Sequence, residues 1–311
     1  MTRESRFLLL YLTFAVATGF ADVRMRAHTD NVVKSYIPGV LSNTESAPGR
    51  YRVLAPLAID AAARVTGASL LSAWYVTRLL FLFAAYCIIH VYLRTWLPPG
   101  SAFAGVAVTA ATLPLTFTNS WPHPDHIPEL ALFTLAACAI ARRRDGWFAA
   151  ALAAAALNRE TSAFLVLLYL VVQPVTRQHL LRTVLFGAEW FAIYAGLRVV
   201  RGLSHYDYWQ AGRNLADLGL LPPAFDPYYR AYAYFGLVLF GPMLYVALRA
   251  RDLPFFARRA LLVVPVFVAV CFLFSSIIES RIFTPLYALV LPALMCAIVP
   301  RVDTRADRPL D

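Results

Sequence analysis

The sequence predicts an all-α, polytopic integral membrane protein with about ten transmembrane helices. Hydrophobic residues make up 60% of the 311 positions, charged residues only 15%, and the mean hydropathy is +0.60. A soluble domain carries nearer a quarter charged residues, so the composition excludes soluble, disordered and coiled-coil classes. At about 30 residues per span and connection, residues 1–311 form a single multi-span membrane domain with room for roughly ten helices.

The net charge of +10 comes from 28 basic and 18 acidic residues, and Lys34 is the only lysine. The arginines lie between apolar runs and form no basic stretch interleaved with aromatic residues. This distribution is typical of cytoplasmic loops that obey the positive-inside rule, and it argues against a nucleic-acid partner. The cysteines lie within apolar segments without CxxC spacing, which indicates small hydrophobic residues: Cys87, Cys138, Cys271 and Cys296.

The first apolar run, residues 7–21, follows a basic start and is either a retained span or a cleavable signal peptide. In both cases the next segment is placed outside. Residues 22–68 then form a first outer loop. Its polar part covers residues 22–52, and its half-apolar part, residues 53–67, is predicted to be a helix on the membrane surface.

Nine further spans follow along the chain: residues 70–93, 102–117, 127–141, 147–157, 163–175, 184–200, 232–248, 261–275 and 282–299. Several are short, and the polar run at 158–161 interrupts one apolar stretch. Polar or non-helical backbone at membrane depth survives only inside protein or beside a wet cavity, so this break is a functional signal. Residues 201–230 form a second large outer loop, whose tyrosines and tryptophans fit the interface belt or a sugar face.

Arginine bias orients the chain with its N-terminus inside, and the short loop at 119–128 carries no lysine or arginine. In this orientation most acidic residues outside the arginine-rich inner loops collect on the outer side: Asp30, Asp125, Glu129, Glu160, Asp207, Asp226 and Glu279. The unusual polar chemistry therefore gathers at one membrane face, as a site at the outer surface requires.

Asp125 and Glu129 are four residues apart, so they share one helix face if the helix starts nearby, with Pro128 tolerated in its first turn. His123, Asp125 and His126 have metal-ligand chemistry. No other helix supplies a matching ligand pair, however, so we expect no metal and no cofactor. The alternative for Asp125 is a helix N-cap favoured by the macrodipole.

Arg159 and Glu160 form an ionisable pair within the interrupted stretch, which makes them functional candidates by default. Helix neighbours point about 100° apart, so one is expected to face a cavity and the other a neighbouring helix. The alternative is a structural ion pair. Glu279 and Arg281 share a face if their segment is extended; Arg281 suits a phosphate or, alternatively, the headgroup level.

Nucleotide-binding, zinc-protease and serine-hydrolase motifs are absent from the sequence. ATP-driven, nicotinamide-dependent and hydrolase functions therefore lack their usual support. No inverted repeat is visible, which weakens the case for a secondary transporter.

Five features spread over most of the chain occur together: Asp30, Asp125, the break at 158–161, residues 51–56 (YRVLAP) and residues 279–281 (ESR). Their arrangement resembles the GT-C superfamily of integral-membrane glycosyltransferases, in particular its small, mostly uncharacterised bacterial members. The resemblance implies transfer of a sugar from a polyprenyl-phosphate-linked donor to an unspecified acceptor. It places this reaction at the periplasmic face of the bacterial inner membrane, with membrane lipids around the protein.

The resemblance also implies residue roles. The first-loop aspartate of the family acts as catalytic base, which corresponds to Asp30, with Asp22 as the alternative; Asp125 is the second candidate catalytic carboxylate. By position, the arginines implied to hold the donor phosphate are Arg52, Arg159 and Arg281. The remaining candidates for substrate binding are His126, Glu129, Glu160 and Glu279.

Two other functions stay open. A flippase or transporter of lipids or lipid-linked sugars would line a path with the same residues, and it predicts essential ionisable groups at several depths. A non-catalytic membrane partner of a polysaccharide assembly machine would tolerate alanine at Asp30, Arg159 and Glu279.

Overall fold

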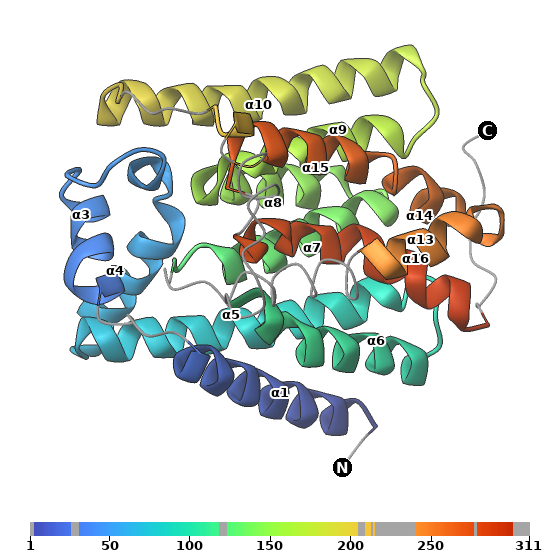
Figure 1. Ribbon diagram of the computed structural model, residues 1–311, viewed down its shortest axis with the longest axis horizontal. Helices are drawn as coiled ribbons and strands as arrows, with labels where there is room; N and C mark the ends of the chain where they lie inside the picture. The colour runs from blue at the N-terminus through green and yellow to red at the C-terminus, as the bar shows by residue number, and fades with distance from the viewer. Residues whose placement is uncertain are drawn as a thin grey trace.

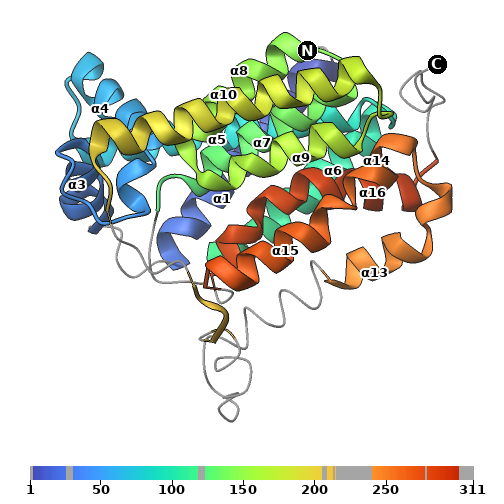
Figure 2. The same ribbon diagram turned by 90° about the horizontal axis from the view of Figure 1, so that it is seen from above.

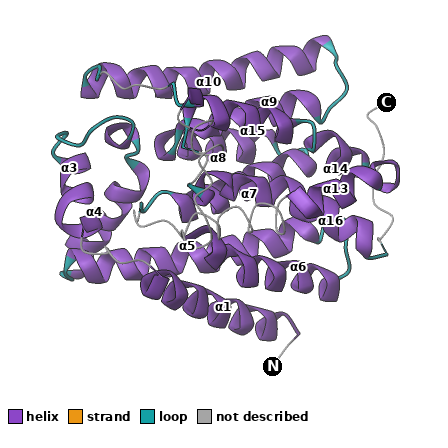
Figure 3. Cartoon of the chain, in the orientation of Figure 1, coloured by secondary structure: helices purple, strands orange, loops and turns teal. Residues whose placement is uncertain are grey.

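A computed structural model of the chain describes residues 3–25, 31–117, 123–204, 209–212, 214, 240–276 and 279–300. Every regular element in these ranges is a helix, and they contain no strand, which confirms the all-α prediction (Figure 3). The helices are α1 (Arg3–Met25), α3 (Ile37–Leu41), α4 (Leu54–Thr66), α5 (Leu70–Leu93), α6 (Pro99–Thr112), α7 (His126–Ala141), α8 (Asp145–Asn158), α9 (Ala163–Val171), α10 (Arg177–Arg201), α13 (Gly241–Leu248), α14 (Phe255–Ala260), α15 (Val263–Phe274) and α16 (Tyr287–Ile298). Short 3₁₀ or π turns join them: η1 (Val32–Tyr36), η2 (Gly49–Tyr51), η3 (Leu113–Phe117), η4 (Glu160–Ser162), η6 (Ala250–Asp252) and η7 (Ser280–Leu286).

The long helices run side by side along the longest axis of the molecule (Figures 1 and 2). In both views α3 and α4 lie together at one end, and α13 and α14 lie at the other. The first of these ends is called the cap end below, and the second the turn end. Because the long helices pass nearly from one end to the other, their connections collect at the two ends (Figures 1 and 2).

In the part of the chain that the structure describes, six helical segments are long and apolar enough to cross a membrane: Ser5–Arg24, Leu70–Leu93, Pro99–Phe117, Arg177–Arg201, Phe255–Phe274 and Ser280–Ile298. The chain is thus a helical protein suited to a membrane. α7, α8 and α9 have 16, 14 and 9 residues, fewer than the roughly 20 that a full crossing needs. The total of about ten spans stays a prediction.

The predicted span at 70–93 coincides with α5, which begins where the Ser69 side chain accepts a hydrogen bond from the Ser72 backbone amide. The predicted surface helix is α4, which ends at Gly67 in the left-handed conformation, with φ of 67°. The polar part of the first outer loop holds more helix than the sequence indicated. η1 and α3 form there because their apolar residues pack with α4 and α5 in a small core: Val32, Tyr36, Ile37, Val40, Val53, Ile59, Ala73 and Trp74. The turn η2 packs against α3 and α10.

The first apolar run belongs to the bundle as α1, which packs against α5 and α6. Tyr11 Oη lies 2.6 Å from His90 Nδ1. One turn from the end of α1, Asp22 is fully buried and forms an ion pair with Arg78. Because Arg78 is buried in α5, its guanidinium needs this carboxylate.

α7 is the most enclosed helix, since it packs against α5, α8, α9 and α16, and nearly every side chain from His126 to Ile140 is buried. Its first turn therefore carries Asp125 and Glu129 into the interior at the cap end. The four cysteines are free thiols, three of them buried, as predicted for small hydrophobic residues.

We predict that Asp22→Asn will lower the free energy of unfolding by about 3 kcal/mol, because it leaves the Arg78 charge buried without a counter-charge. The matched control is Asp60→Asn, whose partner Arg64 is 78% exposed; it should cost less than about 1 kcal/mol. Unfolding in mixed micelles with a denaturing detergent measures both. Equal losses of unfolding free energy in the two variants would contradict a stabilising role for the buried Asp22–Arg78 ion pair.

Candidate functional site

The break predicted at 158–161 is present, and it forms part of the candidate site. α8 ends at Asn158, Arg159 is extended with φ of −157° and ψ of 151°, and η4 follows. Two hydrogen bonds fasten the break to other segments: Val53 N donates to Leu157 O at 3.0 Å, and Asn158 Nδ2 donates to Asp125 O at 2.8 Å. These bonds place residues from the first outer loop, α7 and the break beside one another.

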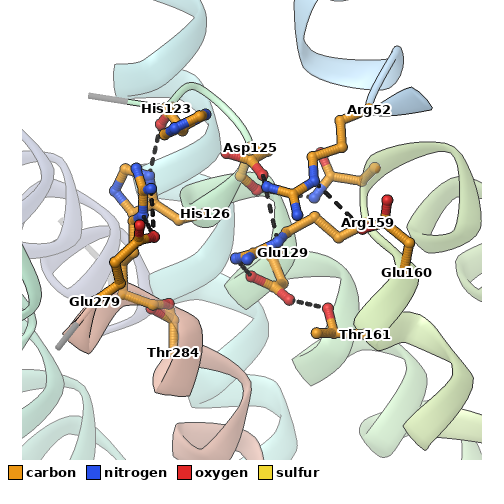
Figure 4. A network of polar contacts seen from close by, with 12 residues as sticks. Arg52, His123, Asp125, His126, Glu129, Arg159, Glu160, Thr161, Glu279 and Thr284 are labelled. Atoms are coloured by element: carbon orange, nitrogen blue, oxygen red, sulfur yellow. Dashed lines mark hydrogen bonds and ion pairs between the residues drawn. The ribbon is translucent and has the colours of Figure 1, made fainter. Parts of the chain in front are cut away.

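Asp125 and Glu129 meet at the buried guanidinium of Arg159 (Figure 4). Arg159 Nε lies 3.3 Å from Asp125 Oδ2, and Arg159 Nη1 donates to Glu129 Oε2 at 2.6 Å. Thr161 Oγ1 also donates to Glu129 Oε1. The four-residue spacing therefore places both carboxylates on one face, as predicted. Asp125 occupies the N-cap position of α7, but its side chain makes no capping bond.

Arg52 and Glu160 extend this network toward α10 (Figure 4). Arg52 donates from Nη1 to Asp125 Oδ2 at 3.1 Å and from Nε to Glu160 Oε2 at 3.3 Å. Glu160 Oε1 lies 4.0 Å from Arg198 Nη2. Arg159 and Glu160 thus reach different partners, because Arg159 is extended and not part of a regular helix. That one of them faces a cavity stays a prediction.

Arg198 joins the network from α10, and its guanidinium stacks on two tyrosines. Its Cζ lies 3.4 Å from the Tyr194 ring centre and 4.4 Å from that of Tyr51. Such cation–π contacts hold a guanidinium in place without neutralising it. The network therefore contains three arginines and three carboxylates: Arg52, Arg159, Arg198, Asp125, Glu129 and Glu160.

Asp125 and Arg52 stay charged despite their burial. Burial alone raises the pKa of the Asp125 carboxyl, but Arg159 and Arg52 outweigh it and hold that pKa well below its usual range. Burial alone lowers the pKa of Arg52, and Glu160 and Asp125 reverse this and raise it. Asp125 is consequently ionised at neutral pH and a weak base while both guanidinium groups contact it.

His123 and Tyr36 lie beside Asp125 at the cap end. Their rings meet edge to face, with centres 4.8 Å apart. Burial and the nearby Arg281 charge hold the pKa of His123 well below its ordinary value, so the imidazole is neutral. Three buried polar atoms here have no hydrogen-bond partner among the described residues: Tyr36 Oη, His123 Nδ1 and Asp125 Oδ1. This is the donor and acceptor set with which a polar ligand would pair.

Glu279 and Arg281 pair with each other, as their spacing allowed. Arg281 Nε donates to Glu279 Oε2 at 3.0 Å, at the start of η7. The Arg281 charge acts on both His123 and Asp125. Figure 4 shows Glu279 and His123 on one side of Asp125 and Arg52 on the other. All predicted site residues in the described ranges except Asp22 and His126 thus gather around Asp125.

His126 faces away from this centre. Its Nδ1 lies 2.8 Å from His123 O, and its Nε2 lies 3.2 Å from Arg78 Nη2. A proton on Nδ1 satisfies both contacts, with Nε2 accepting from the arginine. The His123, Asp125 and His126 side chains therefore do not converge. Within the described ranges, no group of three or more His, Cys, Asp or Glu residues is arranged to hold a metal ion.

Asp30 lies outside the described residues, as do Asp207, Asp226 and most of the second large outer loop. Asp22, the alternative base, is buried against Arg78 and lies away from the Asp125 network. Sequence reasoning missed Arg78 and Arg198. Both are arginines inside apolar helices, a signal that marks functional or paired residues in membrane proteins.

No protein-family model matches the chain, and no curated protein or solved structure is significantly similar to it. The functional inference therefore rests on the geometry and chemistry of the network.

We predict that His123→Gln will flatten the pH dependence of stability below about pH 6.5. An unfolded histidine takes up a proton near that pH, whereas the folded one stays neutral. The folded state thus binds fewer protons, and the free energy of unfolding falls as pH drops, by at most about 1.4 kcal/mol per pH unit.

Detergent unfolding at a series of pH values, for wild type and variant side by side, measures this slope. Parallel pH profiles would show that His123 is protonated in the folded state and would contradict its neutral assignment.

Proposed function

We propose that this chain is a GT-C-type membrane glycosyltransferase that moves a sugar from a polyprenyl-phosphate-linked donor to an acceptor. The observation that supports it best is the buried arginine–carboxylate network at the cap end, assembled from the first outer loop, α7, the α8–η4 break and α10. Buried charges are costly and persist where chemistry uses them. Carboxylates serve as bases, and arginines match phosphate oxygens.

Charge distribution supports a periplasmic location for this site, in the inner membrane of a bacterial cell envelope. The exposed arginines of the turns gather at the turn end: Arg94, Arg142, Arg143, Arg144, Arg177, Arg182, Arg249, Arg251 and Arg258. By the positive-inside rule that end is cytoplasmic. The network, at the opposite end, then faces the periplasm, where lipid-linked donors are used.

The proposed reaction is a displacement at the anomeric carbon. A carboxylate takes the proton of the acceptor hydroxyl, the acceptor oxygen forms the new glycosidic bond, and the bond between the sugar carbon and the phosphate oxygen breaks. Polyprenyl phosphate leaves with the bonding electron pair, and arginines offset the charge that develops on it. We assign the base role to Asp30 and give Asp125 the second carboxylate role.

Donor binding would strengthen Asp125 as a base. Arg52 and Arg159 both contact Asp125 Oδ2 and lower its pKa. A donor phosphate that recruits Arg52 removes one of these charges, and the Asp125 pKa then rises. Glu129 and Thr161 keep Arg159 in place during this exchange. In this scheme proton abstraction follows donor binding.

We predict that Asp30→Asn and Asp125→Asn will each lower sugar transfer by about 100-fold or more, the usual range for loss of a general base. Purified protein in lipid nanodiscs would be supplied with radiolabelled polyprenyl-phosphate sugars and a membrane-extract acceptor pool. The matched control is Asp145→Asn, which removes an aspartate paired with Arg182 at the turn end, and it should keep wild-type transfer. A chelator should leave transfer unchanged.

Absence of transfer from every donor, in a folded protein that still binds polyprenyl phosphate, would refute the transferase and favour a flippase. Full transfer in both aspartate variants would refute the assigned bases.

We predict that Arg52→Lys will weaken donor use by roughly tenfold or more, because lysine keeps the charge but loses the planar fork that binds phosphate and carboxylate together. The readout is the donor KM and kcat in the same assay. Unchanged kinetics would remove Arg52 from the donor site.

A further inference from the structure

The turn end of the bundle holds a second polar feature, which the proposed reaction does not use. A groove of about 880 Å³ lies between the ends of α5 and α7 and the start of α8. Its rim carries Arg142, Arg143, Arg144 and Trp147, and Val91 and Leu135 form part of its apolar wall. Its size matches that of small-ligand sites in proteins.

The backbone at this rim holds an arginine where glycine is normally found. α7 ends with Arg143 N bonded to Ile140 O and Arg144 N bonded to Ala139 O, the bond pattern of a Schellman turn. Arg143 has the left-handed φ of 56° that this turn requires. Glycine adopts that conformation without steric conflict, whereas a side chain is disfavoured. A strained arginine at the mouth of a groove indicates that its guanidinium has a use there.

The three arginines differ in what they contact. Arg142 donates to Val91 O and to Thr95 Oγ1, so it ties the end of α7 to the end of α5. Arg143 and Arg144 are exposed, and within the described residues neither has a carboxylate within ion-pair distance. The adjacent Asp145 is paired with Arg182 instead. The rim therefore presents uncompensated positive charge above an apolar wall.

We infer that this groove binds the headgroup of an anionic phospholipid. Arg143 and Arg144 would hold the phosphate, and Val91 and Leu135 would contact the upper acyl chains. Trp147, 65% exposed, has the amphipathic ring typical of the membrane interface. A soluble anion would not need the apolar wall, whereas a lipid uses both parts of the groove. Basic pockets between helices at the cytoplasmic side have this specificity, and the assignment is independent of the transferase proposal.

Fluorescence quenching of Trp147 tests this inference in the intact protein. Nanodiscs would contain phosphatidylcholine with either brominated phosphatidylglycerol or brominated phosphatidylcholine, because bromine quenches a tryptophan that it contacts. The chain has six tryptophans, so the signal of Trp147→Phe is subtracted. We expect brominated phosphatidylglycerol to quench Trp147 at several-fold lower mole fraction than brominated phosphatidylcholine.

Arg143→Gly is the decisive variant, since it removes the charge and suits the left-handed backbone, so the fold should be at least as stable. We expect Arg143→Gly and Arg144→Gln each to reduce the phosphatidylglycerol preference about fivefold. The matched control is the double variant Arg251→Gln/Arg258→Gln, which removes two exposed arginines from the same end outside the groove, and should keep the preference.

Three results would overturn the inference. An unchanged preference in Arg143→Gly would show that the strained arginine binds no lipid. An equal fall of the phosphatidylglycerol preference in the control variant would show that the preference comes from the net charge of this end and not from the groove. Loss of quenching on addition of inorganic phosphate would identify a soluble anion as the occupant.

Discussion

The pairing of Arg159 with Asp125 and Glu129 is the interaction on which the cap end depends. Charged groups removed from water need partners at close range, and here one guanidinium serves two carboxylates 3.3 and 2.6 Å away. To reach them, the chain leaves the helix at Arg159 and resumes it after η4. The break between α8 and α9, and the depth at which α7 begins, follow from this requirement. Apolar packing alone would favour one continuous helix across residues 145–171.

The same pairing links stability to function. Every arginine at the centre of the network is engaged by a carboxylate or by tyrosine rings, so the charges are balanced before any ligand is bound. In the proposed reaction, the donor phosphate would compete for the Arg52 guanidinium, and Asp125 would become a stronger base on losing that partner. In that proposal, Asp125 would stay a weak base until the donor is bound. At the turn end, by contrast, the exposed Arg143 and Arg144 have no carboxylate within ion-pair distance among the described residues, and we propose that they meet a lipid headgroup.

Particular residues show where local sequence is sufficient and where it fails. α5 was predicted to the residue because a long apolar run has clear ends, and Ser69 caps it. The convergence of Asp125 and Glu129 follows from helical spacing alone. Helices in residues 32–51 were missed, because segments of three to five residues carry too little periodicity. They form by packing on other helices: η1 and α3 on α4 and α5, and η2 on α3 and α10. Arg198 was missed because its partner Glu160 is 38 residues away. His126 was expected in the site, but its ring contacts Arg78 in another part of the bundle.

Composition and spacing alone thus specify an apolar helical bundle, its arginine-rich turns, the interrupted stretch near Arg159 and most of the ionisable residues of the candidate site. These are local properties, set by hydropathy and by the 3.6-residue helical repeat. Tertiary structure decided which charges meet. Arg52 comes from the first outer loop, Arg159 from the break and Arg198 from α10, and all three contact carboxylates at the start of α7 or in η4. Pairings of this kind depend on how the helices pack around a low-dielectric interior. A buried charge without a partner there costs free energy, and this cost selects one arrangement among the many that the same sequence pattern allows.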